Sequence, residues 1–577
     1  MTWAQRLERL VPDLAATFAR FPIPVAISLL LCGWLNIIGG NSDHDGRVAT
    51  GAAAAFIAAG AFHLLAEGRQ LQRGLNWFLA LAAAIAVGLS GYLPAIFHTN
   101  TLFLFAGLLP LLMIAPFMRS GVSQGAIWLF NLRFGLAALL AAVVALLFAL
   151  GLSAIVEALN VLFGAGISGM HEHIWFTAAS LIGPLYGLSL MPRELDEEVN
   201  IRPHSGSLLD RGISVLVNYV AVPVIAVYAL ILHAYAVKIL IEGELPRGQI
   251  GIMVTIFAIG GTACWLIAWP WREQGTRLLR LFMQGWFFLL IVPTVLLAMA
   301  IWRRLVDYGV TPDRYGIALV AVWVGALVLY LAIRRNRADM RAILGAVGVL
   351  LVIGSVGPMG ANGLTISSQF KRLVALLETS GVLKDGKINP KGLLPSEAGS
   401  TGSSIVYALN DAGGLDRLKP WFEGDPKDPF AKRDGDWALA QALNERLGFA
   451  QADVTEDHVN FYTSVAGRFT FPEGAELFGP FQDMRIHDAA YVQQPMTSAS
   501  DKEDVIIKLE DKTYRVAQKR LLEAAKSRPA AKPGFQQTLS VEIEPGVTML
   551  IDQLSGNLNA KPSVNNLRFW LIRRRQP

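Results

Sequence analysis

Residues 22–358 consist of apolar stretches, each roughly twenty residues long, separated by short segments that carry most of the charges. A helix needs about 20 apolar residues to cross the ~30 Å hydrocarbon core of a bilayer. This spacing predicts eleven transmembrane helices, at residues 22–39, 48–66, 75–97, 101–118, 134–158, 173–191, 212–240, 249–270, 278–301, 315–333 and 340–358. Ten or twelve spans stay open, because apolar character continues over residues 126–164 and a second short segment could lie there.

The charge pattern changes at Pro358 and predicts two parts of different class. Residues 1–358 hold one Lys, 22 Arg and 18 acidic residues, whereas residues 359–577 hold 27 basic and 27 acidic residues. A mean hydropathy of +0.43 with only 16% charged residues excludes a soluble globular protein. We therefore predict an all-α polytopic membrane bundle, residues 21–358, followed by an extracytoplasmic α+β domain, residues 359–577.

Residues 1–20 are predicted to form an interfacial amphipathic helix ahead of the first span. Trp3, Leu7 and Leu10 recur at three- and four-residue steps, with Arg6 on the opposite side. No small-x-small cleavage site follows the first apolar run. This run is therefore expected to be a retained span and not a cleaved signal.

Basic residues in short loops predict the orientation, because Lys and Arg are retained on the cytoplasmic side. With the N-terminus in the cytoplasm, seventeen arginines fall on that side: Arg6, Arg9, Arg20, Arg69, Arg73, Arg119, Arg133, Arg193, Arg202, Arg211, Arg272, Arg277, Arg280, Arg334, Arg335, Arg337 and Arg341. Six basic residues fall on the other side: Arg47, Lys238, Arg247, Arg303, Arg304 and Arg314. We predict a multi-pass protein of the bacterial inner membrane with a periplasmic C-terminal domain. Both cysteines, Cys32 and Cys264, fall in predicted spans, so no disulfide is expected in that domain.

A charged segment, "IWRRLVDYGVTPDRYG" at residues 301–316, separates two apolar runs on the predicted outer side. Arg303 and Asp307 are four residues apart on a helical extension of the ninth span, where they can form an ion pair. Thr311 is predicted to be the N-cap of the tenth span, ahead of a proline and an acidic residue in its first turn. Turn and cap chemistry gives the segment a structural interpretation.

The same segment also has a functional interpretation as an anion or headgroup site. Arg303, Arg304 and Arg314 stand on the side of the membrane from which arginine is normally depleted. A bound anion or lipid headgroup would explain their presence there.

Polar residues within predicted spans are candidates for a substrate path. Asn218 precedes Pro223 in the seventh span, and Gln284 precedes Pro293 in the ninth, so each joins a polar side chain to a kink. Glu157 is a further candidate for a proton- or cation-linked group, unless it lies at the outer interface. The alternative is that the amides only hold helices together.

No motif in the chain predicts an enzyme, a cofactor or a metal site. GxSxG, P-loop, dinucleotide, HExxH and CxxC patterns are missing in the right context. Five histidines fall toward the predicted outer face, but only His171 and His173 are close in sequence, and structural zinc needs three or four ligands. Scattered arginines also give no basic surface for nucleic acid.

The C-terminal domain is predicted to contain helices first and strands afterwards. Residues 367–380, 403–411 and 436–447 read as helices, and the alternating runs from residue 504 onward read as a small antiparallel sheet. A Pro- and Asp-rich loop with several aromatic residues follows the second helix. These aromatics either cap a small core or line a groove for an envelope protein or a glycan.

Several stretches resemble one known family of bacterial membrane proteins. They are "WRRLVDYGVTPDRYG", then "RRNRADMR", a Gly-rich final span, and "GANGLTISSQFKRLVALLETSGVLKDGKI". The chain is similar here to the family known only as domain of unknown function four-one-five-three, chiefly over residues 211–387. The resemblance implies a polytopic inner-membrane protein with a trailing extracytoplasmic segment, and it implies no activity.

The favoured function is translocation or handling of an envelope amphiphile or small solute, with the outer domain receiving or gating it. A non-catalytic sensor or assembly scaffold is the alternative, and a membrane-embedded transferase is a second one. Membrane lipids are the expected partners in each case.

Overall fold

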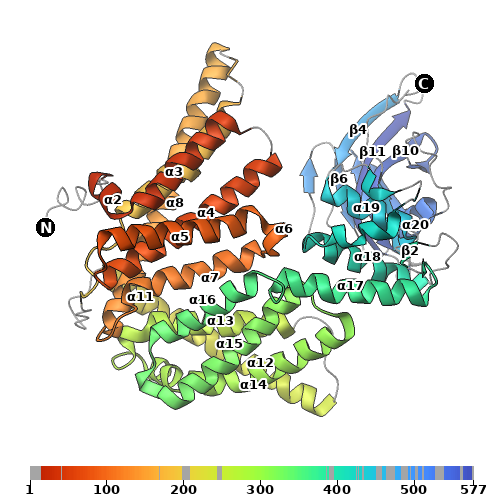
Figure 1. Ribbon diagram of the computed structural model, residues 1–577. Helices are drawn as coiled ribbons and strands as arrows, with labels where there is room; N and C mark the ends of the chain where they lie inside the picture. Colours follow the sequence, from red (N-terminus) through yellow and green to blue (C-terminus); the bar gives the residue numbers. More distant parts are fainter. Residues whose placement is uncertain are drawn as a thin grey trace. The chain divides into compact units, whose positions relative to one another are not determined.

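The computed structural model describes residues 14–39, 42–164, 166–167, 169–197, 208–242, 250–384, 386–388, 396–423, 425, 428–431, 435–449, 458–462, 475–481, 491–493, 496–500, 504–509, 512–526, 539–558 and 563–574. The chain forms two compact units, which are described separately (Figure 1). The first comprises Met1–Ala375 with Ile405–Pro420, and the second comprises Leu376–Ser404 with Trp421–Pro577.

The first unit is helical throughout its described part. Its N-terminal half contains α2 (Leu14–Arg20), α3 (Pro22–Gly33), η1 (Trp34–Ile38), α4 (Ser42–Gly68), α5 (Arg73–Tyr92), α6 (Pro94–Phe97), α7 (Thr101–Ile114), η2 (Ala115–Phe117), α8 (Gln124–Phe163), α9 (Met170–Thr177), η3 (Ala178–Ile182) and α10 (Gly183–Ser189). Its C-terminal half contains α11 (Leu208–Leu216), η4 (Val217–Ala221), α12 (Val222–Glu242), α13 (Ile250–Ala268), η5 (Trp269–Trp271), α14 (Arg277–Tyr308), α15 (Pro312–Arg334), η6 (Arg335–Arg337), α16 (Met340–Ser355) and α17 (Ala361–Thr379).

Seven helices among the described residues are long and apolar enough to cross a membrane. They are His44–Gly68, Arg73–Tyr92, Gln124–Phe163, Arg211–Glu242, Gly251–Trp271, Arg277–Tyr308 and Pro312–Arg334. The pair Leu14–Arg20 and Pro22–Ile38, bent by 110°, gives an eighth if it forms one span. The remaining three predicted spans are helical but shorter or irregular, at Thr101–Phe117, Met340–Ser355 and 170–189. A multi-span membrane region is thus confirmed, and the count of eleven stays a prediction.

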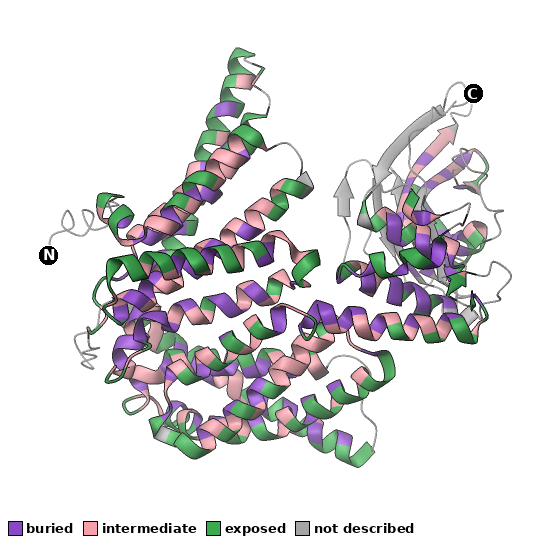
Figure 2. Cartoon of the chain, in the orientation of Figure 1, coloured by how far each residue is buried: buried purple, intermediate pink, exposed green. Residues whose placement is uncertain are grey.

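Helix α8 settles the question that apolar residues 126–164 left open. It runs for 40 residues without interruption, about 60 Å at the α-helical rise, so no second short span lies there. The predicted amphipathic helix at residues 1–20 falls mostly outside the described residues, apart from α2. Many large apolar side chains on the long helices are exposed, as on α5, which is drawn mostly as exposed in Figure 2. Such faces suit contact with lipid.

Hydrogen bonds connect the helix ends of the first unit to one another in two separate groups. In one set, Arg20 binds Glu67 and donates to the Met191 carbonyl oxygen (2.9 Å), and Arg341 donates to that of Phe117 (2.7 Å). In the other set, the Asn100 N–H donates to the Ser355 carbonyl oxygen (2.7 Å), and the Gly357 N–H to that of Phe97 (2.8 Å). Arginines that the sequence assigned to one side therefore lie together at one set of ends.

The second unit combines short helices with small antiparallel sheets. Its helices are the first part of α18 (Ser396–Asp411), η8 (Pro429–Ala431), α19 (Asp436–Arg446) and α20 (Gln518–Lys526), and η7 (Leu415–Phe422) spans the boundary between the units. Its strands are β1 (Leu383–Lys384), β2 (Lys387–Ile388), β3 (His458–Tyr462), β4 (Ala475–Phe481), β5 (Tyr491–Gln493), β6 (Met496–Ser500), β7 (Asp504–Leu509), β8 (Lys512–Ala517), β9 (Leu539–Glu544), β10 (Val547–Asn557) and β11 (Ser563–Arg574).

The strands of this unit do not form the one small sheet that the sequence predicted. Among the described residues, β5-β6-β7-β8 form one sheet, and β3-β10-β11-β4 with β9 beside β10 form another. The error has a physical cause, since alternation identifies strands but not their partners. Helix α20, which the sequence analysis missed, packs its buried Leu521 and Leu522 with strand residues such as Met549 and Phe569 into one core. Mixed α and β structure after the helical region is confirmed.

The aromatic residues of the second unit divide between core and surface. Phe422 is fully buried, with its ring centroid 5.9 Å from that of Phe430, and Trp421 is nearly buried. Trp437 on α19 is 66% exposed. Core packing therefore accounts for the first three aromatics.

Candidate functional site

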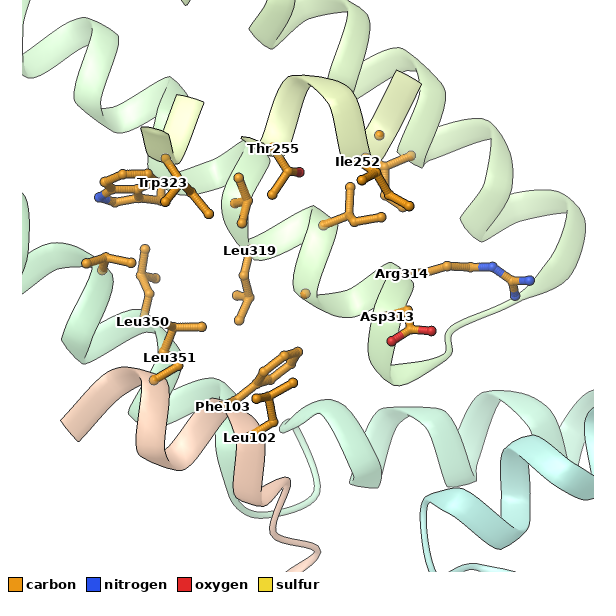
Figure 3. A pocket seen from close by; sticks show the side chains of 18 of the residues that line it. Leu102, Phe103, Ile252, Thr255, Asp313, Arg314, Leu319, Trp323, Leu350 and Leu351 are labelled. Atoms are coloured by element: carbon orange, nitrogen blue, oxygen red, sulfur yellow. The ribbon is translucent and has the colours of Figure 1, made fainter. Parts of the chain in front are cut away.

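A cavity of about 1420 Å³ lies in the first unit and is lined by α7, α13, α14, α15 and α16. Its side chains are shown in Figure 3, where Trp323 lies at one end of the labelled residues and Arg314 with Asp313 at the other. The volume exceeds the ~300–1,000 Å³ typical of pockets for small ligands. A long or branched occupant therefore fits the space better than a compact one.

The walls of this cavity are almost entirely aliphatic and aromatic. Helices α7 and α16 supply one side, including Phe103 and Leu351, and α13 and α15 supply the other, including Ile252, Leu319 and Trp323. Each of these helices is apolar enough to be a membrane segment or a short apolar helix. Such walls offer a bound molecule the same apolar surroundings as the acyl chains of a bilayer.

The charged segment at residues 301–316 forms the rim of the cavity. Arg303, Arg304 and Arg314 all line it, together with Asp307 and Asp313. The Arg303 Nε lies 3.8 Å from an Asp307 carboxylate oxygen, so the predicted ion pair is present. The structure thus brings together the three arginines that the sequence singled out, and it adds the apolar cavity that the sequence did not reveal.

Arg304 and Arg314 carry the unbalanced charge of this rim. Within the part of the chain that the structure describes, neither has a carboxylate oxygen within ion-pair distance. Arg314 instead donates to the carbonyl oxygens of Tyr308 (2.9 Å) and Gly309 (3.0 Å), with its guanidinium 5.4 Å from the Tyr308 ring centroid. The N-terminus of α15 adds its positive dipole end, so an anion is favoured here.

Helix α17 holds the turn between α14 and α15 in place. Ser368 Oγ accepts from the Val310 N–H (3.0 Å), and Gln369 Nε2 donates to the Val310 carbonyl oxygen (2.7 Å). Arg372 Nη1 donates to the Asp307 carbonyl oxygen at 2.8 Å. These bonds fix the backbone that carries the rim arginines.

The close contact with α17 explains a glycine in the turn. Gly309 has φ +70°, and a Cβ there would stand 2.7 Å from the Arg372 Cδ and 2.8 Å from the Ser368 Oγ. A larger residue would therefore be strained by its backbone and would push α17 away.

Arg372 of α17, which the sequence analysis missed, is a further arginine next to the rim segment, although it does not line the cavity. Its charge and that of Arg304 repel the Arg314 guanidinium, so three arginines from three helices share one region. The signal was available in Ser368, Gln369 and Arg372, which lie on one face of a helix at three- and four-residue steps.

Thr311 does not play the capping role that the sequence predicted. It occupies the N-cap position of α15 with extended angles, φ −131° and ψ 162°, but its side chain makes no capping hydrogen bond. Pro at the first helical position and Asp313 in the first turn are as expected. Thr311 instead lines the cavity, and the turn depends on α17 for its hydrogen bonds.

Asn218 lies in the π-helical turn η4 and is buried. Its Oδ1 accepts from the Thr276 N–H (2.9 Å) at the start of α14, and its Nδ2 donates to the Ser214 carbonyl oxygen (2.9 Å). Both ends of the amide are therefore used: Oδ1 joins this helix to α14, and Nδ2 bonds within its own helix. The residue does not line the cavity.

Gln284 is exposed on α14 and is not brought near Asn218. Leu281 and Phe288, three residues before it and four after it, are 67% and 60% exposed, so this face of the helix suits lipid. Asn218 and Gln284 therefore do not line a common cavity, as the predicted substrate path would require.

Glu157 lies near the C-terminal end of α8 and its side chain is 64% exposed. Its carboxylate stands 3.9 Å from the Nε2 of His171, away from the cavity lining. No group of three His, Cys, Asp or Glu side chains suited to a metal ion occurs among the described residues.

These features define a multi-span membrane protein whose helical bundle contains a large apolar cavity with a cationic rim. The chain belongs to the family described as Domain of unknown function (DUF4153), which it matches over residues 26–361. The predicted family is thus confirmed. The match begins earlier than the predicted resemblance at residues 211–387, and it ends at the first residue of α17.

A stretch of 124 residues is 31% identical to an uncharacterized protein of Pasteurella multocida (strain Pm70). The chain spans about a fifth of the length of that relative, since the similarity covers 20% of each chain. No solved structure matches the chain. Function therefore has to be argued from the cavity.

Replacing Asn218 by Leu should destabilise the bundle, whereas replacing Gln284 by Met should not. The Asn218→Leu variant leaves the Thr276 N–H without its acceptor, which costs about 1–3 kcal/mol. Gln284→Met exchanges a polar for an apolar side chain on a face suited to lipid. Thermal unfolding of the two purified variants measures the difference. Equal melting temperatures would contradict the capping role of Asn218.

Proposed function

We propose that the protein binds and handles an anionic amphiphile of the cell envelope, with its apolar chains in the cavity and its headgroup at the arginine rim. The observation that carries this proposal is that one cavity joins aliphatic walls to Arg304 and Arg314, neither of which has a carboxylate partner among the described residues. Apolar chains and an anionic head are the two halves of an amphiphile.

The energetics favour such a ligand over a small polar solute. Moving an acyl chain from the bilayer into an apolar cavity costs little, because both surroundings are equally apolar. Hydrogen bonds between guanidinium groups and a phosphate or carboxylate are about twice as strong as neutral ones. The acyl chains of the ligand therefore fill the cavity, and the rim arginines select for a negatively charged headgroup. A polar solute would meet almost no hydrogen-bonding group along the walls.

Two other functions receive less support from the geometry. A scaffold needs no internal space of 1420 Å³, and a solid bundle would serve it better. A transferase needs its carboxylate and imidazole beside the substrate, whereas the close pair of Glu157 on α8 and His171 on α9 is exposed. Both side chains lie outside the cavity lining.

The proposal includes an orientation and a span count. Eleven crossings result if the bent pair joins the seven candidate spans as an eighth and the three shorter or irregular apolar helices also cross. This count would put the N-terminus and the C-terminal unit on opposite sides. The excess of arginine at one set of helix ends assigns that set to the cytoplasm. The cavity rim then belongs to the periplasmic side of the inner membrane. The second unit would receive or gate the amphiphile there, or bind an envelope protein or glycan.

Cysteine labelling tests this orientation. In a chain with Cys32 and Cys264 replaced by Ala, a cysteine at the exposed Lys387 should react with an impermeant thiol reagent in cells with a permeabilised outer membrane. A cysteine at the exposed Ser120 should react only after the inner membrane is lysed. The reverse pattern would contradict the orientation.

Photocrosslinking tests the ligand class. The full chain is placed in nanodiscs of phosphatidylcholine that contain phosphatidylglycerol with a photoactivatable acyl chain, and crosslinked peptides are mapped by mass spectrometry. We expect crosslinks in α13, α15 and α16. The double variant Arg304→Gln/Arg314→Gln should bind the probe at least about tenfold more weakly, since two charge-assisted contacts are lost.

Two further variants separate the roles of rim and walls. Arg334→Gln, at the opposite end of α15, should leave crosslinking unchanged. Ala106→Phe, which adds volume inside the cavity, should reduce crosslinking whatever the headgroup. Equal yields from wild type and all three variants, or equal yields from zwitterionic and anionic probes, would contradict the proposal.

A further inference from the structure

A second, smaller recess lies on the other face of α16. It has a volume of about 590 Å³ and runs between α7 and α16. Leu111, Ile114, Ala346 and Val349 are among its apolar lining residues, whereas Leu344 and Val347 of the same helix line the large cavity. Residues one or two positions apart on a helix point to different faces, as Ala346 and Val347 do, so α16 separates the two spaces.

Three arginines surround one end of this groove. They are Arg69, Arg119 and Arg341, and each follows or precedes an apolar helix at the set of ends that also contains the Arg20–Glu67 pair. All three belong to the group that the sequence assigned to the cytoplasmic side. The groove therefore combines an apolar track with cationic groups at the membrane surface opposite to the rim of the large cavity.

The contacts of these three arginines differ, because two of them have a carboxylate partner. Arg341 is held by the Asp339 carboxylate, with Nη2 2.7 Å from its Oδ2, and Arg119 pairs with Asp196. Burial opposes the ionisation of Asp339, but hydrogen bonds from Arg341 outweigh it and hold the Asp339 pKa below its usual value. Each of these two arginines therefore has a carboxylate partner that offsets its charge.

The charge of Arg69 is not offset by an acidic partner among the described residues. Its Nε donates to the Met118 carbonyl oxygen (2.9 Å), which fixes the side chain across the connection after α7. Among the residues that the structure describes, no carboxylate lies within ion-pair distance of Arg69. Its terminal nitrogens remain available beside the groove, and the residue is exposed.

We propose that this α7–α16 groove is a second site, which binds one anionic phospholipid with its phosphate at Arg69 and an acyl chain along Ile114 and Ala346. The volume lies within the range of ~300–1,000 Å³ that is usual for ligand sites. Exposed Met118 and Val349 beside it give the chain a continuous path into the surrounding bilayer. Basic recesses between membrane helices bind anionic headgroups in this manner. The site does not depend on the function proposed for the large cavity.

The same photoactivatable phosphatidylglycerol tests this site, because peptide mapping distinguishes the two spaces. We expect crosslinks in residues 111–118, which contribute to the groove and not to the large cavity, in addition to those of the large cavity. Arg69→Gln should lower the yield in residues 111–118 about fivefold, as expected for one arginine near a membrane surface, and leave the crosslinks in α13 and α15 unchanged. Arg69→Lys should restore most of the yield.

Matched variants show whether both halves of the lipid are bound. Arg73→Gln removes an exposed arginine four residues further along, which does not line the groove, and should change nothing. Ala346→Trp, at an exposed position in the groove, should abolish crosslinking to residues 111–118. Ala346→Ser adds little volume and should keep it.

Three results would overturn the proposal. Equal crosslinking of residues 111–118 by phosphatidylcholine and phosphatidylglycerol probes would show that the groove does not select charge. Full competition by inorganic phosphate, together with no effect of Ala346→Trp, would show a free-anion site. Unchanged yields for Arg69→Gln would remove the headgroup contact. None of these results bears on the large cavity, whose own variants are Arg304→Gln/Arg314→Gln.

Discussion

The close approach of α7 and α16 is the constraint on which both candidate sites depend. A Cβ added at Gly107 would stand 2.9 Å from the Gly348 carbonyl oxygen, and one added at Gly348 would stand 3.0 Å from that of Gly107. Only glycine permits two helices to meet backbone to backbone in this way. The pair therefore forms a thin wall, with the large cavity on one face and the smaller groove on the other. A larger residue at either glycine would separate the helices and alter both spaces together.

The large cavity combines charged and apolar surface because of the structure of the turn between α14 and α15. The α14–α15 connection carries Arg304 and Arg314, and its backbone is held by Ser368 and Gln369 of α17. This arrangement keeps guanidinium groups at a fixed rim above an apolar space, where free side chains would otherwise turn toward water. A ligand that contacts the rim also contacts groups held by α17, so the rim and α17 should respond together to binding.

The sequence predicted much of the fold but little of the cavity. Runs of twenty apolar residues identify membrane helices because the bilayer sets their length, and the arginine-rich segment at residues 301–316 identified the rim. The volume of the cavity depends on how five helices pack, which no local pattern records. Asn218 was misleading for a related reason: a buried amide in a kinked span suits a substrate path and a helix cap equally well, and only the Thr276 N–H distinguishes them. Thr311 likewise occupies the N-cap position without making its hydrogen bond, while Ser368 and Gln369 of α17 bind the backbone of the neighbouring Val310.

A density map of the protein extracted directly from its native membrane, with its lipids retained, tests the central claim most directly. The account predicts elongated density along the cavity between α15 and α16 that ends within hydrogen-bond distance of the Arg304 and Arg314 guanidinium groups. A cavity that contains only water-sized peaks, or one closed by the side chains of α13 and α16, would contradict it.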